Sequence, residues 1–138
     1  MTYSASYSPS MPIPMEPMVL GPVLVTRTTA ELNVSVYVPW KNCKLAYAYA
    51  VTTTVVGTAN FEIDLELNAA SGTEIMSITL PTASSAVGDI AEATFSDASA
   101  GYNLDRDNAD RDAINIEIGE HASGAAAAMV FMYFEPMN

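Results

Sequence analysis

Apolar and polar residues alternate along much of this chain, and each alternating stretch is closed by Gly, Asn, Ser, Asp or Pro. In the clearest stretch, residues 61–67, Phe61, Ile63 and Leu65 are separated by acidic residues. A period of two fits a half-buried strand and no helix. Comparable alternation covers residues 32–38, 43–51, 76–80 and 114–118. The pattern predicts an all-β protein, a single-domain antiparallel sandwich of two sheets.

Three further stretches complete the predicted sandwich. Residues 19–25 contain Gly21-Pro22, which indicates a short edge strand or a kinked one, and residues 90–95 predict a weaker strand. The last stretch, residues 126–134, is apolar on both faces, with Met129, Phe131 and Tyr133 sharing one of them. Such a strand lies centrally in a sheet or is covered by a partner. The total of roughly eight strands suits a jelly-roll-like arrangement.

The first 18 residues differ from the rest of the chain, because they hold four of its eight prolines and four of its eight methionines. Closely spaced prolines favour extended backbone and remove amide donors. We therefore expect an extended N-terminal arm, residues 1–18, ahead of a sandwich domain at residues 19–138. The apolar side chains of the arm need cover: Met11, Ile13, Met15 and Met18. A frayed terminus and an arm that lies across a neighbouring subunit both remain open.

Charge and cysteine content narrow the classes of partner. Half of the 138 residues are apolar, so the chain can bury one core, and 16 acidic against 5 basic residues give a net charge of −11. This surface repels phosphates, so neither nucleic acid nor an anionic membrane is an expected partner. We expect no signal peptide and no transmembrane helix. Cys43 is the only cysteine, which fits assembly in a reducing compartment, and it begins an apolar strand face, which predicts a buried thiol.

The densest polar cluster, residues 103–112, is a weak candidate for calcium. Its carboxylates are Asp105, Asp107, Asp110 and Asp112. Counted from Asp105, the twelfth position holds Ile116 where a calcium loop needs Glu, and two arginines neutralise part of the charge. A solvated acidic loop and a loop that pairs with a basic partner are the alternatives.

No catalytic residue and no cofactor site are predicted. His121 is the only histidine and lies in a predicted turn, and Glu62, Asp64 and Glu66 share one strand face, as expected of a solvated sheet surface. An aromatic cluster surrounds the second and third strands: Tyr37, Trp40, Tyr47 and Tyr49. Such rings pack in cores or interfaces, and they also stack sugars.

The order of loops and strands in residues 30–135 resembles a known family. A strand that ends in an apolar-Pro step (residues 77–81) precedes a small-residue loop with Gly-Asp (residues 83–90). An Asn/Asp-rich loop, a short strand (residues 113–119), a small-residue turn (residues 122–125) and a terminal apolar strand follow. This cadence is similar to that of the head decoration, or cement, proteins of tailed bacteriophages.

The resemblance implies a jelly-roll-like sandwich without catalytic residues that binds the outer face of a capsid, commonly as a trimer. The implied partners are the major capsid protein and further copies of the chain, on a virion surface assembled in the host cytoplasm. Met129, Phe131 and Tyr133 would then line a seam between copies, and the arm would act as a strap. The alternative is a carbohydrate- or receptor-binding β-sandwich module of a phage tail or surface structure.

Overall fold

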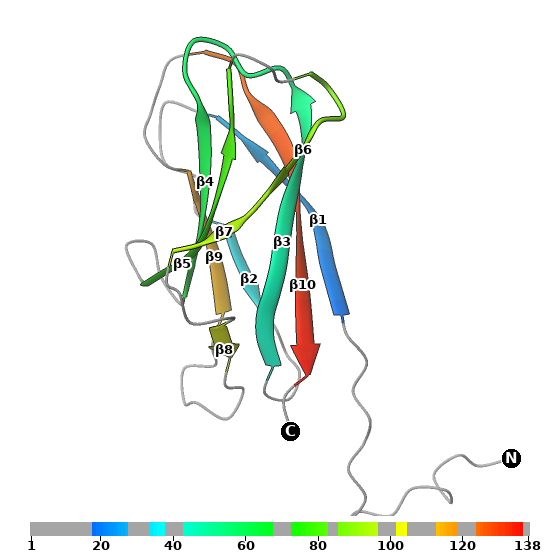
Figure 1. Cartoon of the computed structure of the whole chain (residues 1–138), viewed down its shortest axis with the longest axis vertical. Coiled ribbons are helices and arrows are strands. Elements are labelled where there is room, and N and C mark those ends of the chain that lie inside the picture. Colours follow the sequence, from blue (N-terminus) through cyan, green and yellow to red (C-terminus); the bar gives the residue numbers. More distant parts are fainter. Residues whose placement is uncertain are drawn as a thin grey trace, which may run out of the picture.

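The protein is an all-β sandwich of two antiparallel sheets (Figure 1). A computed structural model describes residues 18–27, 34–37, 43–67, 73–82, 86–96, 102–104, 113–118 and 124–136. The strands of the first half are β1 Met18–Thr26, β2 Val34–Tyr37, β3 Cys43–Thr54, β4 Phe61–Leu67 and β5 Thr73–Leu80. Those of the second half are β6 Ile90–Glu92, β7 Thr94–Phe95, β8 Tyr102–Leu104, β9 Ala113–Ile118 and β10 Ala127–Pro136. The predicted fold class is confirmed.

Strand pairing follows a nested order. The first strand, β1, pairs with the last, β10, and β2 pairs with β9. Farther in, β3 pairs with β6 and β8, and β4 pairs with β5. Contacts of β10 with β3 and of β9 with β4 then join these pairs into sheet A (β1-β10-β3-β6, with β8 beside β3) and sheet B (β2-β9-β4-β5-β7). This nesting is the jelly-roll arrangement that the sequence predicts.

One side of the sandwich is closed by a strand that changes sheet. Residues 90–95 form one predicted strand, but the structure divides them at Ala93: β6 pairs with β3 in sheet A and β7 pairs with β5 in sheet B. Between residues 95 and 113, where the sequence predicts a loop and no strand, the structure contains β8, which continues along the free edge of β3 beyond β6. The prediction of a loop without strands was wrong for residues 102–104, because a strand of three residues is too short to show an alternation of apolar and polar residues.

The core lies between the sheets and combines large and small side chains. Sheet B contributes bulky residues that are fully buried: Phe61, Ile63, Leu65, Met76, Ile78, Leu80, Ile114, Ile116 and Ile118. Sheet A faces them in part with Ala48, Ala50 and Ala128, together with Val130, Met132 and Phe134. Small residues opposite large ones let the two layers interdigitate at the density of protein interiors.

The alternation of β3 reverses part-way along the strand. Cys43 and Leu45 face the core as predicted, but Tyr47 and Tyr49 do not continue that face, because the inward positions become Ala48 and Ala50. The register with β10 steps from Phe134↔Leu45 to Tyr133↔Tyr47, which leaves one extra residue in β3. A bulge of one residue exchanges the two faces of a strand. Both tyrosines therefore lie on the outer face of sheet A.

Strand β1 forms an edge of sheet A and begins one residue earlier than the predicted domain boundary. Met18, assigned above to the arm, pairs with Phe134 and packs against the core. The kink predicted at Gly21-Pro22 is confirmed as a register shift between Leu20 and Val23. The remainder of the predicted arm, residues 1–17, lies outside the described residues.

Arg27, directly after β1, holds the loop between β3 and β4. Its guanidinium donates hydrogen bonds to the carbonyl oxygens of Gly57 (3.0 Å) and Ala59 (2.8 Å) and lies over the ring of Phe61 at 5.1 Å. Burial of this cation lowers the pKa of Arg27. Backbone carbonyls and an aromatic face thus stabilise the buried charge and fix the loop to the end of β1.

Within the ranges that the structure describes, no helix has the length and apolar character needed to cross a membrane.

Candidate functional site

The outer face of sheet A carries an exposed array of large apolar side chains, which we call the apolar face. Cross-strand pairing arranges its members in rows. One row is Val19–Tyr133–Tyr47, the next is Phe131–Tyr49–Glu92, and the third is Leu24–Met129–Val51–Ile90. Glu92 is the one charged side chain in these rows. Directly opposed residues on one sheet face touch each other, so the rows form one continuous surface.

Exposure distinguishes this surface from the ordinary outer side of a sheet. Ile90 is 64% exposed, Val19 56%, Leu24 55%, Tyr47 38% and Met129 37%. Single exposed apolar residues are common on proteins and need no explanation. Contiguous apolar patches larger than roughly a few hundred Å² are rare on monomeric soluble proteins and mark binding surfaces for a protein or a ligand.

Aromatic rings at the centre of the apolar face hold each other in place. Tyr49 stacks on Phe131 with ring centroids 5.0 Å apart and an interplanar angle of 13°, and Tyr47 lies 5.7 Å from Tyr49. The hydroxyl of Tyr47 donates a hydrogen bond of 2.9 Å to Glu92, which raises the pKa of Tyr47. Rings fixed in this way lose little conformational entropy on binding, as is typical of protein-binding and sugar-binding surfaces.

Gly21 keeps the central row open at its edge. This glycine has a φ of +134°, and a Cβ atom there would lie 2.7 Å from the carbonyl oxygen of Val130 and 3.1 Å from Cδ1 of Phe131. No other residue fits this place without displacing backbone. Gly21 itself therefore places no side chain against the Phe131 ring, and Pro22 is the second residue of the bulge opposite Phe131.

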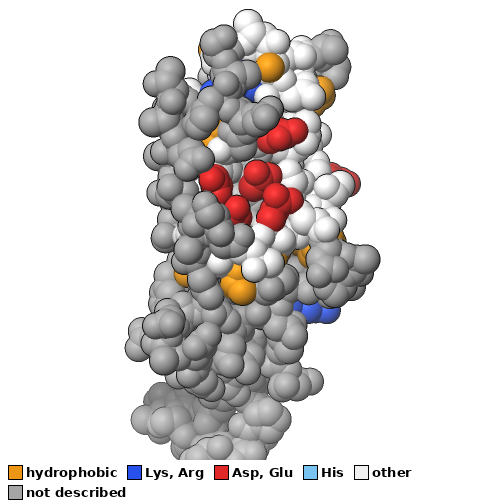
Figure 2. Space-filling model, turned by 90° about the vertical axis from the view of Figure 1, so that its left-hand side faces the viewer, with side chains coloured by type: hydrophobic (Ala, Val, Ile, Leu, Met, Phe, Trp, Pro, Cys, Tyr) orange, Lys and Arg blue, Asp and Glu red, His pale blue; other side chains and the backbone are white. Residues whose placement is uncertain are grey.

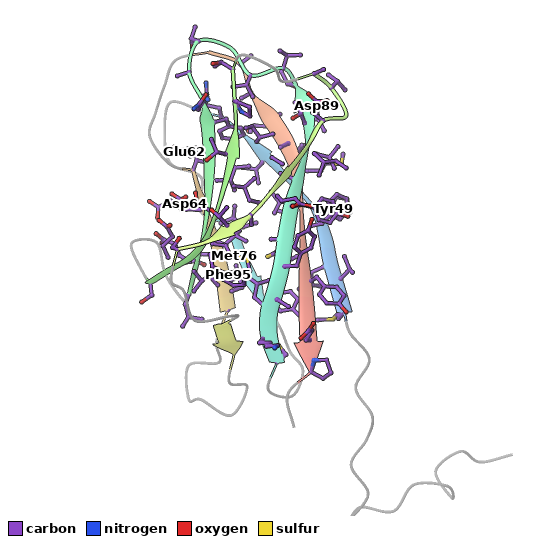
Figure 3. The ribbon with its side chains drawn as sticks, viewed as in Figure 1. Tyr49, Glu62, Asp64, Met76, Asp89 and Phe95 are labelled. Carbon is purple, nitrogen blue, oxygen red and sulfur yellow. The ribbon has the colours of Figure 1, made fainter. Side chains whose placement is uncertain are left out.

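The opposite side of the sandwich is acidic. Carboxylates gather on the outer face of sheet B (Figure 2), and we call this surface the acidic face; it comprises Glu62, Asp64, Glu74 and Glu117. Figure 3 shows Tyr49 and Asp64 directed away from each other on the two sides of the molecule. The distribution of charge is thus strongly asymmetric: the apolar face is nearly neutral, while the other outer face concentrates negative charge.

Asp64 is a half-buried carboxyl of the acidic face. Burial raises the pKa of Asp64. The hydroxyl of Ser77 donates a hydrogen bond of 2.8 Å to Asp64, which lowers this pKa. The charges of Glu74, Glu62 and Glu117 raise it further. A carboxyl with a raised pKa in the folded state binds its proton more readily there than in the unfolded chain. The contribution of Asp64 to the free energy of unfolding therefore falls as the pH rises from the ordinary pKa of this carboxyl, 3.8, through its raised pKa.

We expect Asp64→Asn to increase the free energy of unfolding at pH 7, because the amide keeps an acceptor for Ser77 and removes a repelled charge. The gain should disappear at about pH 3, where Asp64 is protonated in both states. Urea unfolding of the variant and of the unchanged chain at the two pH values measures this. A variant that is destabilised at pH 7 and unchanged at pH 3 would contradict this, because it would show that the charged carboxylate stabilises the fold.

One part of the predicted solvated face is buried. Glu66 is only 7% exposed and lies opposite Asn115, which is 5% exposed. The alternation of residues 61–67 predicts a solvent-facing surface for Glu62, Asp64 and Glu66, and for Glu66 this prediction was wrong. Alternation predicts on which side of a sheet a residue lies, but not whether further chain covers that side.

The remaining sequence candidates have different outcomes. Cys43 is buried, as predicted, at 2% exposure, and burial raises the pKa of its thiol, which keeps it protonated and unreactive. Among the proposed interface residues, Met129, Phe131 and Tyr133 all lie on the outer face of β10. Outside the described residues lie the calcium candidates (Asp105, Asp107, Asp110 and Asp112), the arm residues (Met11, Ile13 and Met15), and Trp40 and His121.

No cluster suited to a metal ion occurs among the His, Cys, Asp and Glu side chains of the described ranges. The acidic face therefore offers charge, but no formed metal centre. Leu24, Tyr47, Tyr49 and Ile90 are members of the apolar face that sequence reasoning did not select as interface residues. The aromatic cluster is the signal in the sequence that points to these residues. Its tyrosines Tyr47 and Tyr49 can be placed on the outer face of sheet A only when the bulge in β3 is known.

Comparisons with protein-family models, with curated protein sequences and with solved structures gave no match, so the fold and the two outer faces carry the functional argument.

Proposed function

We propose that this chain is a non-enzymatic structural protein of a virion, which binds the outside of a phage capsid and stabilises it. The apolar face carries the proposal. A chain with a charge of −11 that retains a wide apolar surface with a single charged side chain is adapted to stay soluble until specific contacts cover that surface. The jelly-roll arrangement and the loop order of residues 30–135 agree with the decoration proteins that the sequence resembles.

The proposed partners are the major capsid protein and further copies of this chain, in a homotrimer. Several copies held together bind a repetitive shell with a much higher effective affinity than one copy does, without any new type of contact. The acidic face, on the other side of the sandwich, would prevent random association of neighbouring assemblies. The buried free thiol of Cys43 is compatible with assembly in the cytoplasm of the host.

The test is binding to particles. Virions from the source that encodes this chain are purified, stripped of loosely bound proteins with denaturant below the disruption point of the shell, and incubated with the purified protein. We expect the protein to be detected in the untreated virions by mass spectrometry and to bind again to the stripped shells at saturable stoichiometry. Absence from purified virions, together with no binding to stripped shells, would contradict the proposal.

A second function is favoured by the stacked rings of Tyr49 and Phe131. Stacked, partly exposed aromatic rings with the Glu92 carboxylate beside them are also suited to stack a sugar and accept its hydroxyl hydrogen bonds. In that case the chain would be a carbohydrate- or receptor-binding module of a tail or surface structure. A glycan array separates the two: saturable sugar binding that Tyr49→Ala abolishes would favour the module, and no binding would favour the shell protein.

A further inference from the structure

We propose that the apolar face is the binding surface for the N-terminal segment, residues 1–17, of a second copy of this chain. The inference rests on the proposed self-association and specifies which surface and which segment make the contact. It is argued from the chemistry of the face, the chemistry of the segment, and the point at which the segment joins the sandwich.

The first argument is chemical fit. The segment contains three methionines, four prolines, two tyrosines and one isoleucine, and its only charged residue is Glu16. Methionine thioethers make favourable contacts with aromatic rings, and proline-rich segments bind to grooves and surfaces lined by aromatics. The apolar face offers Tyr47, Tyr49 and Phe131 as such rings. A nearly uncharged segment also avoids the repulsion that an acidic partner would meet on this chain.

The second argument is length. Seventeen residues in extended, proline-rich backbone reach about 50 Å at ~3.1 Å per residue. Strand β10, which crosses the apolar face from end to end, has 10 residues and spans about 34 Å at ~3.4 Å per residue. The segment is therefore long enough to leave one copy, bridge to a neighbour and cross the whole face of that neighbour.

The third argument is the direction in which the segment leaves. It joins β1 at Met18, at the edge of sheet A, where Met18 pairs with Phe134. Pro17 disfavours helical backbone at residue 16, and the closely spaced prolines of the segment favour extended backbone. We therefore expect the segment to continue in line with β1, away from its own sheet. The face of a second copy is then the accessible surface, in an exchange of segments between copies.

The test joins the segment of one copy to the face of another. A full-length Met15→Cys chain is mixed with an isotope-labelled full-length Met129→Cys chain and treated with a short bismaleimide, which forms a thioether with each thiol. The matched control replaces the acceptor with Thr79→Cys, an exposed position on the outer face of sheet B. Leu24→Cys, in the same row as Met129, serves as a second acceptor. Circular dichroism confirms that every variant is folded.

We expect mass spectrometry to find the mixed cross-link between position 15 and each apolar-face acceptor in at least tenfold excess over the Thr79→Cys control. Equal cross-linking to both faces, or none to either apolar-face acceptor, would overturn the inference. A double variant, Met15→Cys with Met129→Cys, that cross-links within single chains at high dilution would show that a chain covers its own face, and would also overturn it. The experiment contains no shells, so its result is independent of the test of capsid binding.

Discussion

Phe134→Ala is expected to lower the free energy of unfolding by about 3–5 kcal/mol, the usual cost of removing a fully buried aromatic ring. Phe134 is 1% exposed and faces the core from β10. Phe131, three residues earlier on the same strand, lies on the outer face and packs mainly on Tyr49. For Phe131→Ala we expect a loss of less than about 2 kcal/mol, because an aromatic pair at a surface contributes about 0.5–1.5 kcal/mol beyond burial.

Equilibrium unfolding in urea, at a protein concentration low enough to keep the chains monomeric, measures both variants. Both variants replace Phe by Ala in the same strand, so strand propensity and residue type are the same. The difference between their losses of unfolding free energy therefore shows which side of β10 faces the core. Equal losses of stability in the two variants would contradict the assignment of Phe134 to the core and Phe131 to the apolar face.

The second large effect is expected on self-association. In a chain that carries both Tyr49→Ser and Phe131→Ser, the rings at the centre of the apolar face are removed. Truncation of a central aromatic anchor costs about 2 kcal/mol or more of binding free energy, and each 1.4 kcal/mol is a factor of ten in the dissociation constant. We expect self-association to weaken at least about 100-fold, while the fold is retained.

Glu62→Ser, on the acidic face, is the matched control and should leave the dissociation constant within about a factor of three. Analytical ultracentrifugation over a range of concentrations gives the constants for both variants and for the unchanged chain. Added salt should strengthen the association, because it screens the repulsion between copies that each carry a net charge of −11. If the control variant weakened association as much as the double variant does, the acidic face would be the site of contact.

Periodicity alone was sufficient for the class of fold and most of its strands. β4 begins and ends where the alternation of residues 61–67 predicts, and the apolar character of residues 126–134 correctly indicates a central strand. Such signals are strong because each residue of a half-buried strand independently reports its side of the sheet. The edge position and kink of β1 were also readable, from Gly21-Pro22.

The face on which some side chains lie could not be predicted, because it depends on strand register and on contacts between elements. The bulge in β3 carries no residue signature, because the extra residue is Ala46 among other alanines, and yet it decides on which face Tyr47 and Tyr49 lie. The burial of Glu66 depends on contacts beyond its own strand, and Arg27 acquires its partners only when the β3–β4 loop folds over the end of β1. The candidate site was therefore predictable on β10 and not on β3.

The mass of the purified full-length chain in solution tests the central claim most directly, because the account holds that the apolar face is present for contact with other copies. Sedimentation equilibrium or native mass spectrometry is expected to find a reversible oligomer, a trimer in the proposed function, which the combined Tyr49→Ser and Phe131→Ser variant fails to form. A chain that remains a monomer at every concentration, with or without these substitutions, would contradict the account.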